Sequence, residues 1–167
     1  MKAKREGLVS DYITDALLFL MEREDYHNIS ITDLCKKAGV TRMSFYRNFE
    51  SKEDILRKWL KDVTEQFLKE SGISYRDDTS RDYIITLFTH LKQYQRICSA
   101  IYKAGLSYLL KDEFDRVFLS IHREEYEDYK SYFHAGGIYN VFLLWLIKGC
   151  AESPEELADK LTGMLDK

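Results

Sequence analysis

The feature that most constrains the fold is a segment near the start of the chain, residues 29–49, which reads ISITDLCKKAGVTRMSFYRNF. Ser30 followed three residues later by Asp33 is typical of a capped helix N-terminus, with Asp in place of the usual Glu, and it predicts a helix over residues 31–38. Gly39 then stands where a chain leaving a helix needs a positive φ, which glycine adopts without steric cost. The segment therefore predicts a short helix that ends in a sharp turn.

A second short helix is expected after this turn. Thr41 and Ser44 are both residues that can cap it, and the helical pattern ends near Asn48. Two short helices joined by a turn of a few residues that contains glycine are typical of the helix-turn-helix motif. Residues 8–21 have apolar side chains at helical spacing, which predicts an amphipathic helix before the motif. The head of the chain is thus expected to be a bundle of three helices.

The rest of the chain favours helices over strands. A single proline and eight glycines among 167 residues leave few positions that would break a helix. Ser153 before Pro154, with Glu156 in the first turn, predicts a sharply defined start for the last helix. We therefore expect an all-α protein of about nine helices, with a helix-turn-helix head over residues 1–50 and a helical body over residues 51–167. The helices are expected at residues 8–21, 31–38, 41–48, 51–68, 81–95, 96–110, 112–131, 135–150 and 154–165.

The distribution of charge fits a protein that touches nucleic acid only through its head. Residues 1–60 carry 11 Lys and Arg against 10 Asp and Glu, and the remaining residues carry 14 against 18. A protein that packs DNA through bulk charge would be basic overall, whereas this chain has a formal net charge of −3. Its head therefore has to rely on a few well-placed cations.

In a helix-turn-helix motif the second helix enters the major groove, with its N-terminal residues nearest the base edges. Arg42 is the best candidate for reading a base, because a guanidinium matches O6 and N7 of guanine, but it can equally bind a phosphate. Lys52 lies one residue inside a helix that Ser51 can cap, where backbone N–H groups already favour an anion. The residues predicted to contact DNA are Thr41, Arg42, Met43, Ser44, Tyr46, Arg47, Asn48 and Lys52.

The longer stretch ITDLCKKAGVTRMSFYRNFESKEDIL combines an AGV turn, an aromatic-Tyr-x-x-Phe pattern and an SKE triplet. At these spacings it resembles the signature of the TetR family of one-component transcriptional regulators, and the similarity covers about residues 8–60. The resemblance implies DNA contacts by Thr41, Arg42, Ser44, Tyr46, Asn48 and Lys52, and core positions for Phe45 and Phe49. Many members have a histidine where this chain has Asn48, and Arg47 also departs from the common pattern, so the operator sequence stays open.

The C-terminal stretch FHAGGIYNVFLLWLIKGCAESPEELADKL looks like the last two helices of one subgroup of this family. The resemblance implies that these helices pair with their copies across a two-fold axis, in a homodimer that places two heads on half-sites about 34–36 Å apart. The residues expected at the interface are Ile138, Phe142, Trp145, Leu146, Leu157, Leu161 and Leu165.

The resemblance also implies an effector pocket in the body, for an unknown small molecule that releases a repressor from DNA. Pockets for such ligands are apolar and aromatic, and the body is rich in aromatic residues, of which Phe88, Tyr102, Phe118 and Tyr126 are the candidates. Aromatic residues at helical spacing also build ordinary cores. Some relatives activate transcription, so an activator remains an alternative to a repressor. A helical protein–protein adaptor is a second alternative, and it would ignore DNA at low ionic strength.

We expect no enzyme, because the sequence has no nucleophile–base pair, phosphate-binding loop or paired metal ligands. His122 and Glu125 are spaced one helical turn apart, but no second pair of possible metal ligands accompanies them. No cofactor or metal is therefore expected either. Cys98 and Cys150 could form a redox pair, but free cysteines are usually buried small apolar residues. The longest apolar stretch, residues 138–147, is shorter than the about 20 residues of a membrane span. These features predict a cytoplasmic protein without a membrane partner.

Overall fold

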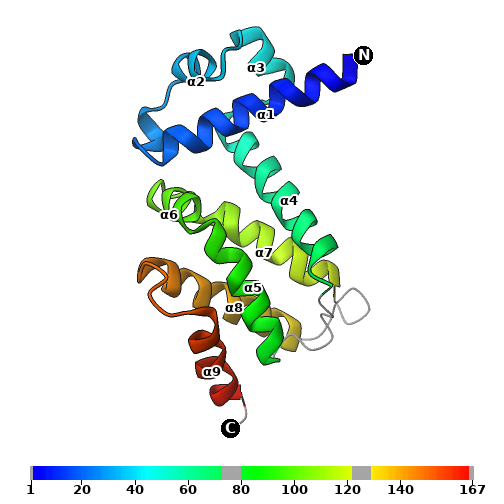
Figure 1. Cartoon of the computed structure of the whole chain (residues 1–167), viewed down its shortest axis with the longest axis vertical. Helices are drawn as coiled ribbons and strands as arrows, with labels where there is room; N and C mark the ends of the chain where they lie inside the picture. The colour runs from blue at the N-terminus through cyan, green and yellow to red at the C-terminus, as the bar shows by residue number, and fades with distance from the viewer. Residues whose placement is uncertain (1, 73–79, 122–128, 166–167) are drawn as a thin grey trace.

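The computed structural model describes residues 2–72, 80–121 and 129–165, and this part of the chain consists of helices and their connections, as the sequence predicts. The elements are α1 (Lys2–Met21), the 3-10 turn η1 (Tyr26–Asn28), α2 (Ile31–Ala38), α3 (Arg42–Asn48), α4 (Lys52–Glu70), α5 (Arg81–Gln93), α6 (Gln95–Lys103), α7 (Ser107–Ile121), α8 (Tyr129–Ile147) and α9 (Pro154–Leu165). The head lies at one end of the molecule and α9 at the other, and α4 leads from the head into the body (Figure 1). Within the described ranges, no helix has both the length and the apolar character that a membrane span requires.

The helix ends in the head depend on the residues that the sequence predicts for them. The Ser30 side chain accepts a hydrogen bond from the backbone N–H of Asp33 at 3.0 Å, which starts α2. Gly39 ends the same helix with a φ of 67°. Of the two candidate caps for α3, Thr41 is the one used, because its hydroxyl accepts from the N–H of Ser44 at 3.1 Å. The predicted helix-turn-helix motif is therefore confirmed.

The three helices of the head enclose a small apolar core. Phe45 of α3 and Phe49, which follows the last residue of this helix, are buried, with 6.2 Å between their ring centroids. Ile13 and Leu17 of α1 and Leu34 of α2 complete this core, each fully buried. The predicted core positions of Phe45 and Phe49 are thus confirmed, and burying the two rings fixes which side of α3 faces outward.

Two predicted helix boundaries in the body are wrong: residues 96–110 form two helices rather than one, and the predicted break between residues 131 and 135 lies inside α8. Gly105 separates α6 from α7 and has a φ of 73°. The N–H of Leu106 bonds back to the carbonyl of Ile101 at 3.1 Å, in the manner of a helix that ends at a glycine. The apolar spacing on both sides of Gly105 runs through the break, and the sequence pattern therefore hides it.

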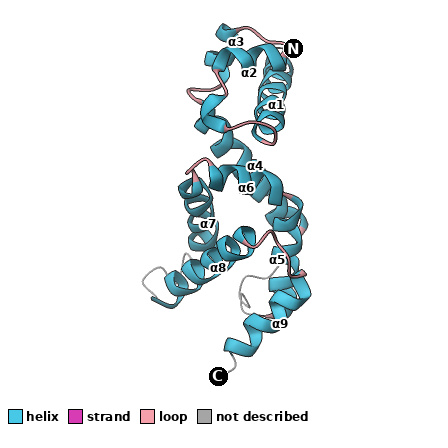
Figure 2. Cartoon of the chain, turned by 90° about the vertical axis from the view of Figure 1, so that its left-hand side faces the viewer, coloured by secondary structure: helices cyan, strands magenta, loops and turns pink. Residues whose placement is uncertain are grey.

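In the body, α5 packs against α9, while α7 packs against both α8 and α4. Figure 2 shows the head above these helices, with α7 and α8 on one side of the body and α5 and α9 on the other. Aromatic pairs fill the core: Phe88 lies edge-on to Trp145 at 5.3 Å between ring centroids, and Phe114 stacks on Phe142 at 5.4 Å. These contacts draw α5, α7 and α8 together.

The buried side of α8 changes the expected dimer interface. Four of the residues predicted for it lie inside the single chain, namely Phe142, Trp145, Leu146 and Leu157. A partner cannot cover side chains that the chain's own helices already enclose, so these four belong to the core. Ile138 and Leu161 are half-buried against the same core, and the side chain of Leu165 lies outside the described residues.

Candidate nucleic-acid interface

One face of α3 points outward and carries half of the side chains predicted to contact DNA. Arg42, Met43, Tyr46 and Arg47 are all exposed, and offsets of one, four and five residues place them on the same side of the helix. Met43 leaves 73% of its surface exposed, a high fraction for an apolar side chain. On the opposite side, the ring of Phe45 is buried and lies edge-on to Tyr46 at 5.1 Å. The outer face therefore offers two guanidinium groups, a phenol and a thioether to a partner.

Three other predicted side chains are engaged within the helix itself. The Thr41 hydroxyl caps α3 and also lies 3.0 Å from the hydroxyl of Ser44. The side-chain amide of Asn48 donates to the backbone carbonyl of Ser44 at 2.7 Å, across the last turn. These groups define the two ends of α3, so any contact that they make to DNA must use the hydrogen-bonding capacity left over.

Lys52 takes a position different from the one its sequence context indicates. Its ammonium points into the head and donates to the backbone carbonyls of Tyr26 and Ile29, at 2.6 and 2.7 Å. It also lies 4.1 Å from the centre of the Tyr26 ring. Burial lowers the pKa of Lys52, whereas Asp25 and Glu53 act in the opposite direction. The structure therefore groups Lys52 with η1 rather than with the outer face of α3.

Sequence reasoning missed η1 and the contacts that it organises. Asp25 caps this turn by accepting from the N–H of His27 at 2.8 Å. The ring of Tyr26 is buried beneath Lys52, and burial, followed by the charge of Glu53, raises the pKa of Tyr26 to about 12. The polar run before the motif predicts only that α1 ends there, because three residues are too few to show a helical period.

Three contacts tie the head, and the start of α4 that follows it, to α6 and α7. His27 Nε2 lies 3.0 Å from the carbonyl of Ala104, at the end of α6. At the start of α7, the Tyr108 hydroxyl donates to the carboxylate of Glu53 at 2.9 Å. One turn further along both helices, Arg57 of α4 forms an ion pair with Asp112 of α7 at 2.9 Å. The orientation of the head is therefore coupled to the positions of α6 and α7.

The body holds a narrow apolar cavity of about 80 Å³ between α4, α5, α6, α7 and α8. Of the four aromatic residues predicted for an effector pocket, Phe118 lines it. Phe88 instead packs in the core against Trp145, Tyr102 is exposed on α6, and Tyr126 lies outside the described residues. The sequence identifies the aromatic character of such a pocket but not which rings face it, since all of them share the helical spacing of a core.

Polar side chains are few along this cavity, and their charges are suppressed or compensated. The His90 ring stacks on Phe67 with 4.2 Å between ring centroids, and burial lowers its pKa, which favours the neutral form. The carboxylate of Glu113 accepts two hydrogen bonds from Arg116, at 2.9 and 2.6 Å. The remaining lining is largely aliphatic or aromatic. Such a cavity is suited to a neutral, apolar ligand.

Cys98 and Cys150 do not have the properties of a reactive pair. Cys35, Cys98 and Cys150 are all free and buried. Burial raises the pKa of Cys98 to about 12 and also raises that of Cys150. Since the thiolate is the reactive form of cysteine, both groups are held in their unreactive state at neutral pH. In the described ranges, no three His, Cys, Asp or Glu side chains gather closely enough to hold a metal ion.

Comparison with known families agrees with this geometry. Residues 13–58 match the model of bacterial regulatory proteins of the tetR family, and residues 78–167 match a transcriptional regulator C-terminal region of that class. The first match contains the helix-turn-helix motif, and the second covers more than half of the chain. The protein belongs to the TetR family of transcriptional regulators, as the sequence motifs predict, and this is a family of regulators rather than enzymes.

Two curated relatives come from Bacillus subtilis (strain 168). The chain is 24% identical over 165 residues to the uncharacterized HTH-type transcriptional regulator YxbF, covering 89% of this chain and 42% of the relative. It is 35% identical over 63 residues to the uncharacterized HTH-type transcriptional regulator YdgC, covering 34% of this chain and 32% of the relative. The chain thus spans less than half the length of either relative.

Solved structures share the fold over nearly the whole chain. A TetR transcriptional regulator from Streptococcus agalactiae 2603V matches with a TM-score of 0.71 and 21% identity, covering 98% of this chain and 97% of the other. The dihydroxyacetone kinase operon activator DhaS matches with a TM-score of 0.64 and 18% identity, covering 94% and 93%. The fatty acid degradation regulator FadR from Bacillus halodurans matches with a TM-score of 0.57 and 16% identity, covering 93% of both chains. At these identities the likeness concerns the fold.

Proposed function

We propose that this protein binds palindromic operator DNA as a homodimer, and that a small apolar effector releases it to relieve repression. The outer face of α3 carries this proposal, because it presents two arginines and a tyrosine that make no ion pair in the described part of the chain. Arg42 lies at the N-terminus of the helix, nearest the bases, and is suited to guanine. Tyr46 and Arg47 lie one turn further on and are suited to phosphates.

Exposed apolar side chains on α8 support the homodimer. Phe133, Leu144 and Ile147 have 73%, 54% and 58% of their surface exposed. They are separated by 11 and 3 residues, so they lie along one side of the helix. Gly137 and Asn140, which are also exposed, fall on the same side and leave room for a second helix to approach. An apolar stripe of this kind favours association, and a two-fold dimer through α8 would present two heads to a palindrome.

The apolar cavity supports a neutral, hydrophobic effector. Its present volume of about 80 Å³ is smaller than the about 300–1,000 Å³ of most small-molecule pockets. An effector must therefore widen it by displacing helices that line it. Two of these helices are joined to the head or to the start of α4, α6 through Ala104 and α7 through Tyr108. A ligand that favours the widened body would lower the population of molecules whose heads fit the two half-sites.

Fluorescence anisotropy on the DNA upstream of the protein's own gene tests DNA binding, with scrambled DNA of the same composition as the reference. We expect selective binding that weakens as salt rises. Arg42→Gln should weaken it by about tenfold, and Tyr46→Phe by a smaller factor. Tyr102→Phe, the matched change on α6, should have no effect. Apolar small molecules added to the preformed complex then test release.

Each part of the proposal has a contrary outcome. Absence of binding at low salt would indicate a protein–protein adaptor instead. If no apolar molecule releases the complex, the effector part of the proposal fails and the DNA-binding part stands. A reporter gene placed behind the bound DNA reports the sign of control, and higher expression in the presence of the protein would make it an activator. Action on chromosomal DNA would place the protein in the cytoplasm.

A further inference from the structure

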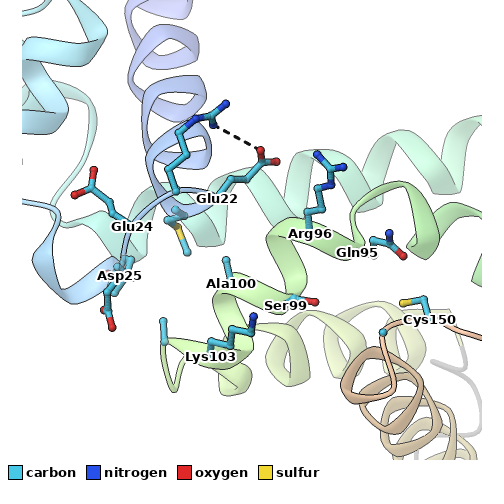
Figure 3. A pocket seen from close by; sticks show the side chains of 14 residues that line it. Glu22, Glu24, Asp25, Gln95, Arg96, Ser99, Ala100, Lys103 and Cys150 are labelled. Carbon is cyan, nitrogen blue, oxygen red and sulfur yellow. Dashed lines mark ion pairs between the residues drawn. The ribbon is translucent and has the colours of Figure 1, made fainter.

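A second and larger cavity lies between the head and the body. It has a volume of about 640 Å³, within the range of small-molecule sites. One wall is the end of α1 and the following turn, from Met21 to Tyr26, and the other is the outer side of α6, from Gln95 to Ala104. Figure 3 shows the two walls facing each other, with Cys150 at one edge. We refer to this cavity as the head–body cleft.

The head–body cleft is separate from the apolar cavity, and the two share no lining residue. Helix α6 divides them: Tyr94 and Cys98 line the apolar cavity, whereas Arg96, Ser99 and Lys103 line the cleft. A molecule bound on either side would therefore press on the same helix, whose end is joined to the head through His27.

The two walls of the cleft carry opposite charge. Glu22, Glu24 and Asp25 line the head wall, and Arg96 and Lys103 line the wall made by α6. Arg23 also lies on the head wall, but its guanidinium pairs with Glu22 and covers the Phe19 ring. In the described residues no ion pair crosses the cleft, and Glu24, Arg96 and Lys103 each lack an ion-pair partner.

This pattern restricts what can bind. A ligand with charge of one sign would meet like charge on one of the walls, and an uncharged ligand would cover the free charges without compensating them. A dipolar ligand satisfies both walls, with its cationic group toward Glu24 and its anionic group toward Arg96 or Lys103. The volume of about 640 Å³ leaves room for a ligand longer than a single amino acid, whose two charged ends can reach the two walls.

We propose that the head–body cleft binds short zwitterionic peptides, with the ammonium terminus on the head wall and the carboxylate terminus on α6. A peptide bound in this way bridges the two parts of the molecule and fixes the angle between them. Operator affinity and peptide affinity then change each other by the same factor. This site goes beyond the operator binding and apolar effector proposed above.

The protein, free of DNA, is tested by thermal unfolding with a random mixture of tripeptides whose termini are ionised. The same mixture with acetylated and amidated termini is the chemical control, and free amino acids at equal concentration show whether the length of a peptide is needed. We expect the ionised tripeptides to raise the melting temperature by about 2–4 °C, and the other two mixtures to have little effect. Because no DNA is present, the result does not depend on operator binding.

Three substitutions locate the site: Glu24→Gln, Arg96→Gln and Lys103→Gln. None of these side chains has an ion-pair partner in the described chain, so each change should leave the peptide-free protein equally stable while weakening peptide binding by about tenfold. Lys69→Gln, the same change at an exposed lysine of α4, is the matched control and should retain the full shift.

Three outcomes would overturn the proposal. The first is the absence of a shift with ionised tripeptides, and the second is an equal shift with the blocked mixture. The third is a full melting-temperature shift retained by all three variants. In that third case the peptides would bind elsewhere on the molecule and not in the head–body cleft.

Discussion

The ammonium of Lys52, at the N-terminus of α4, donates two hydrogen bonds and lies over an aromatic ring. The sequence context predicts a phosphate contact at this position, since Ser51 caps the helix and its free N–H groups favour an anion. The carbonyls that bind Lys52 belong to Tyr26 and Ile29, more than 20 residues earlier in the chain. A partner this remote has no periodic signal in the sequence, whereas the buried positions of Phe45 and Phe49 are implied by the family motif in which the two residues lie.

Lys52→Met separates the two roles of this side chain. The change leaves two carbonyls without their donor, so we expect the free energy of unfolding to fall by about 1–3 kcal/mol. Thermal unfolding measures this loss, with Arg42→Gln as the control, because Arg42 is exposed and its loss should weaken DNA binding without lowering the melting temperature. Equal melting temperatures for Lys52→Met and the parent would contradict this structural role, and weaker DNA binding by the same variant would then assign Lys52 to the phosphates.

At the scale of the helices, glycine decides where the chain turns. Gly39 and Gly105 both adopt positive φ and end a helix, yet only the first was predicted from the sequence. The residues after Gly39 start a new and visible cap at Thr41, whereas those after Gly105 continue the apolar spacing of α6 into α7. The helix-turn-helix motif can therefore be predicted with good boundaries. The α6–α7 corner, which positions Ala104 against the head and Tyr108 against the start of α4, cannot.

Gly39→Ala tests the turn between α2 and α3. A Cβ at this position meets no neighbouring atom, so the cost comes from the φ of 67° alone, and we expect a loss of about 1 kcal/mol. Gly163→Ala is the matched control, because this glycine lies within α9, also faces open space, and should gain up to about 1 kcal/mol. Chemical denaturation gives both values. Changes of the same sign would contradict the role assigned to Gly39.

At the scale of the whole molecule, the sequence predicts a head and a body but not the surface through which two molecules meet. Helix α8 is apolar on more than one side, so its pattern does not distinguish the face that packs on α7 from the face left for a partner. The fold makes this distinction, because Phe142, Trp145 and Leu146 are enclosed by the chain, whereas Leu144 and Ile147 are exposed.

A double substitution, Leu144→Glu with Ile147→Glu, tests the exposed face of α8 as the dimer interface. Both side chains are more than half exposed, so the folded monomer should keep its stability, whereas two carboxylates in an apolar interface would prevent association. Light scattering coupled to size exclusion should then give half the parent's mass, and operator affinity should fall by at least about tenfold because the two heads no longer bind together. Leu8→Glu, which places the same charge on an exposed leucine of the head, should leave the mass unchanged. A dimer that survives the double substitution would mean that another surface joins the two molecules. That surface would then set the distance between the two heads, and with it the spacing of the DNA half-sites.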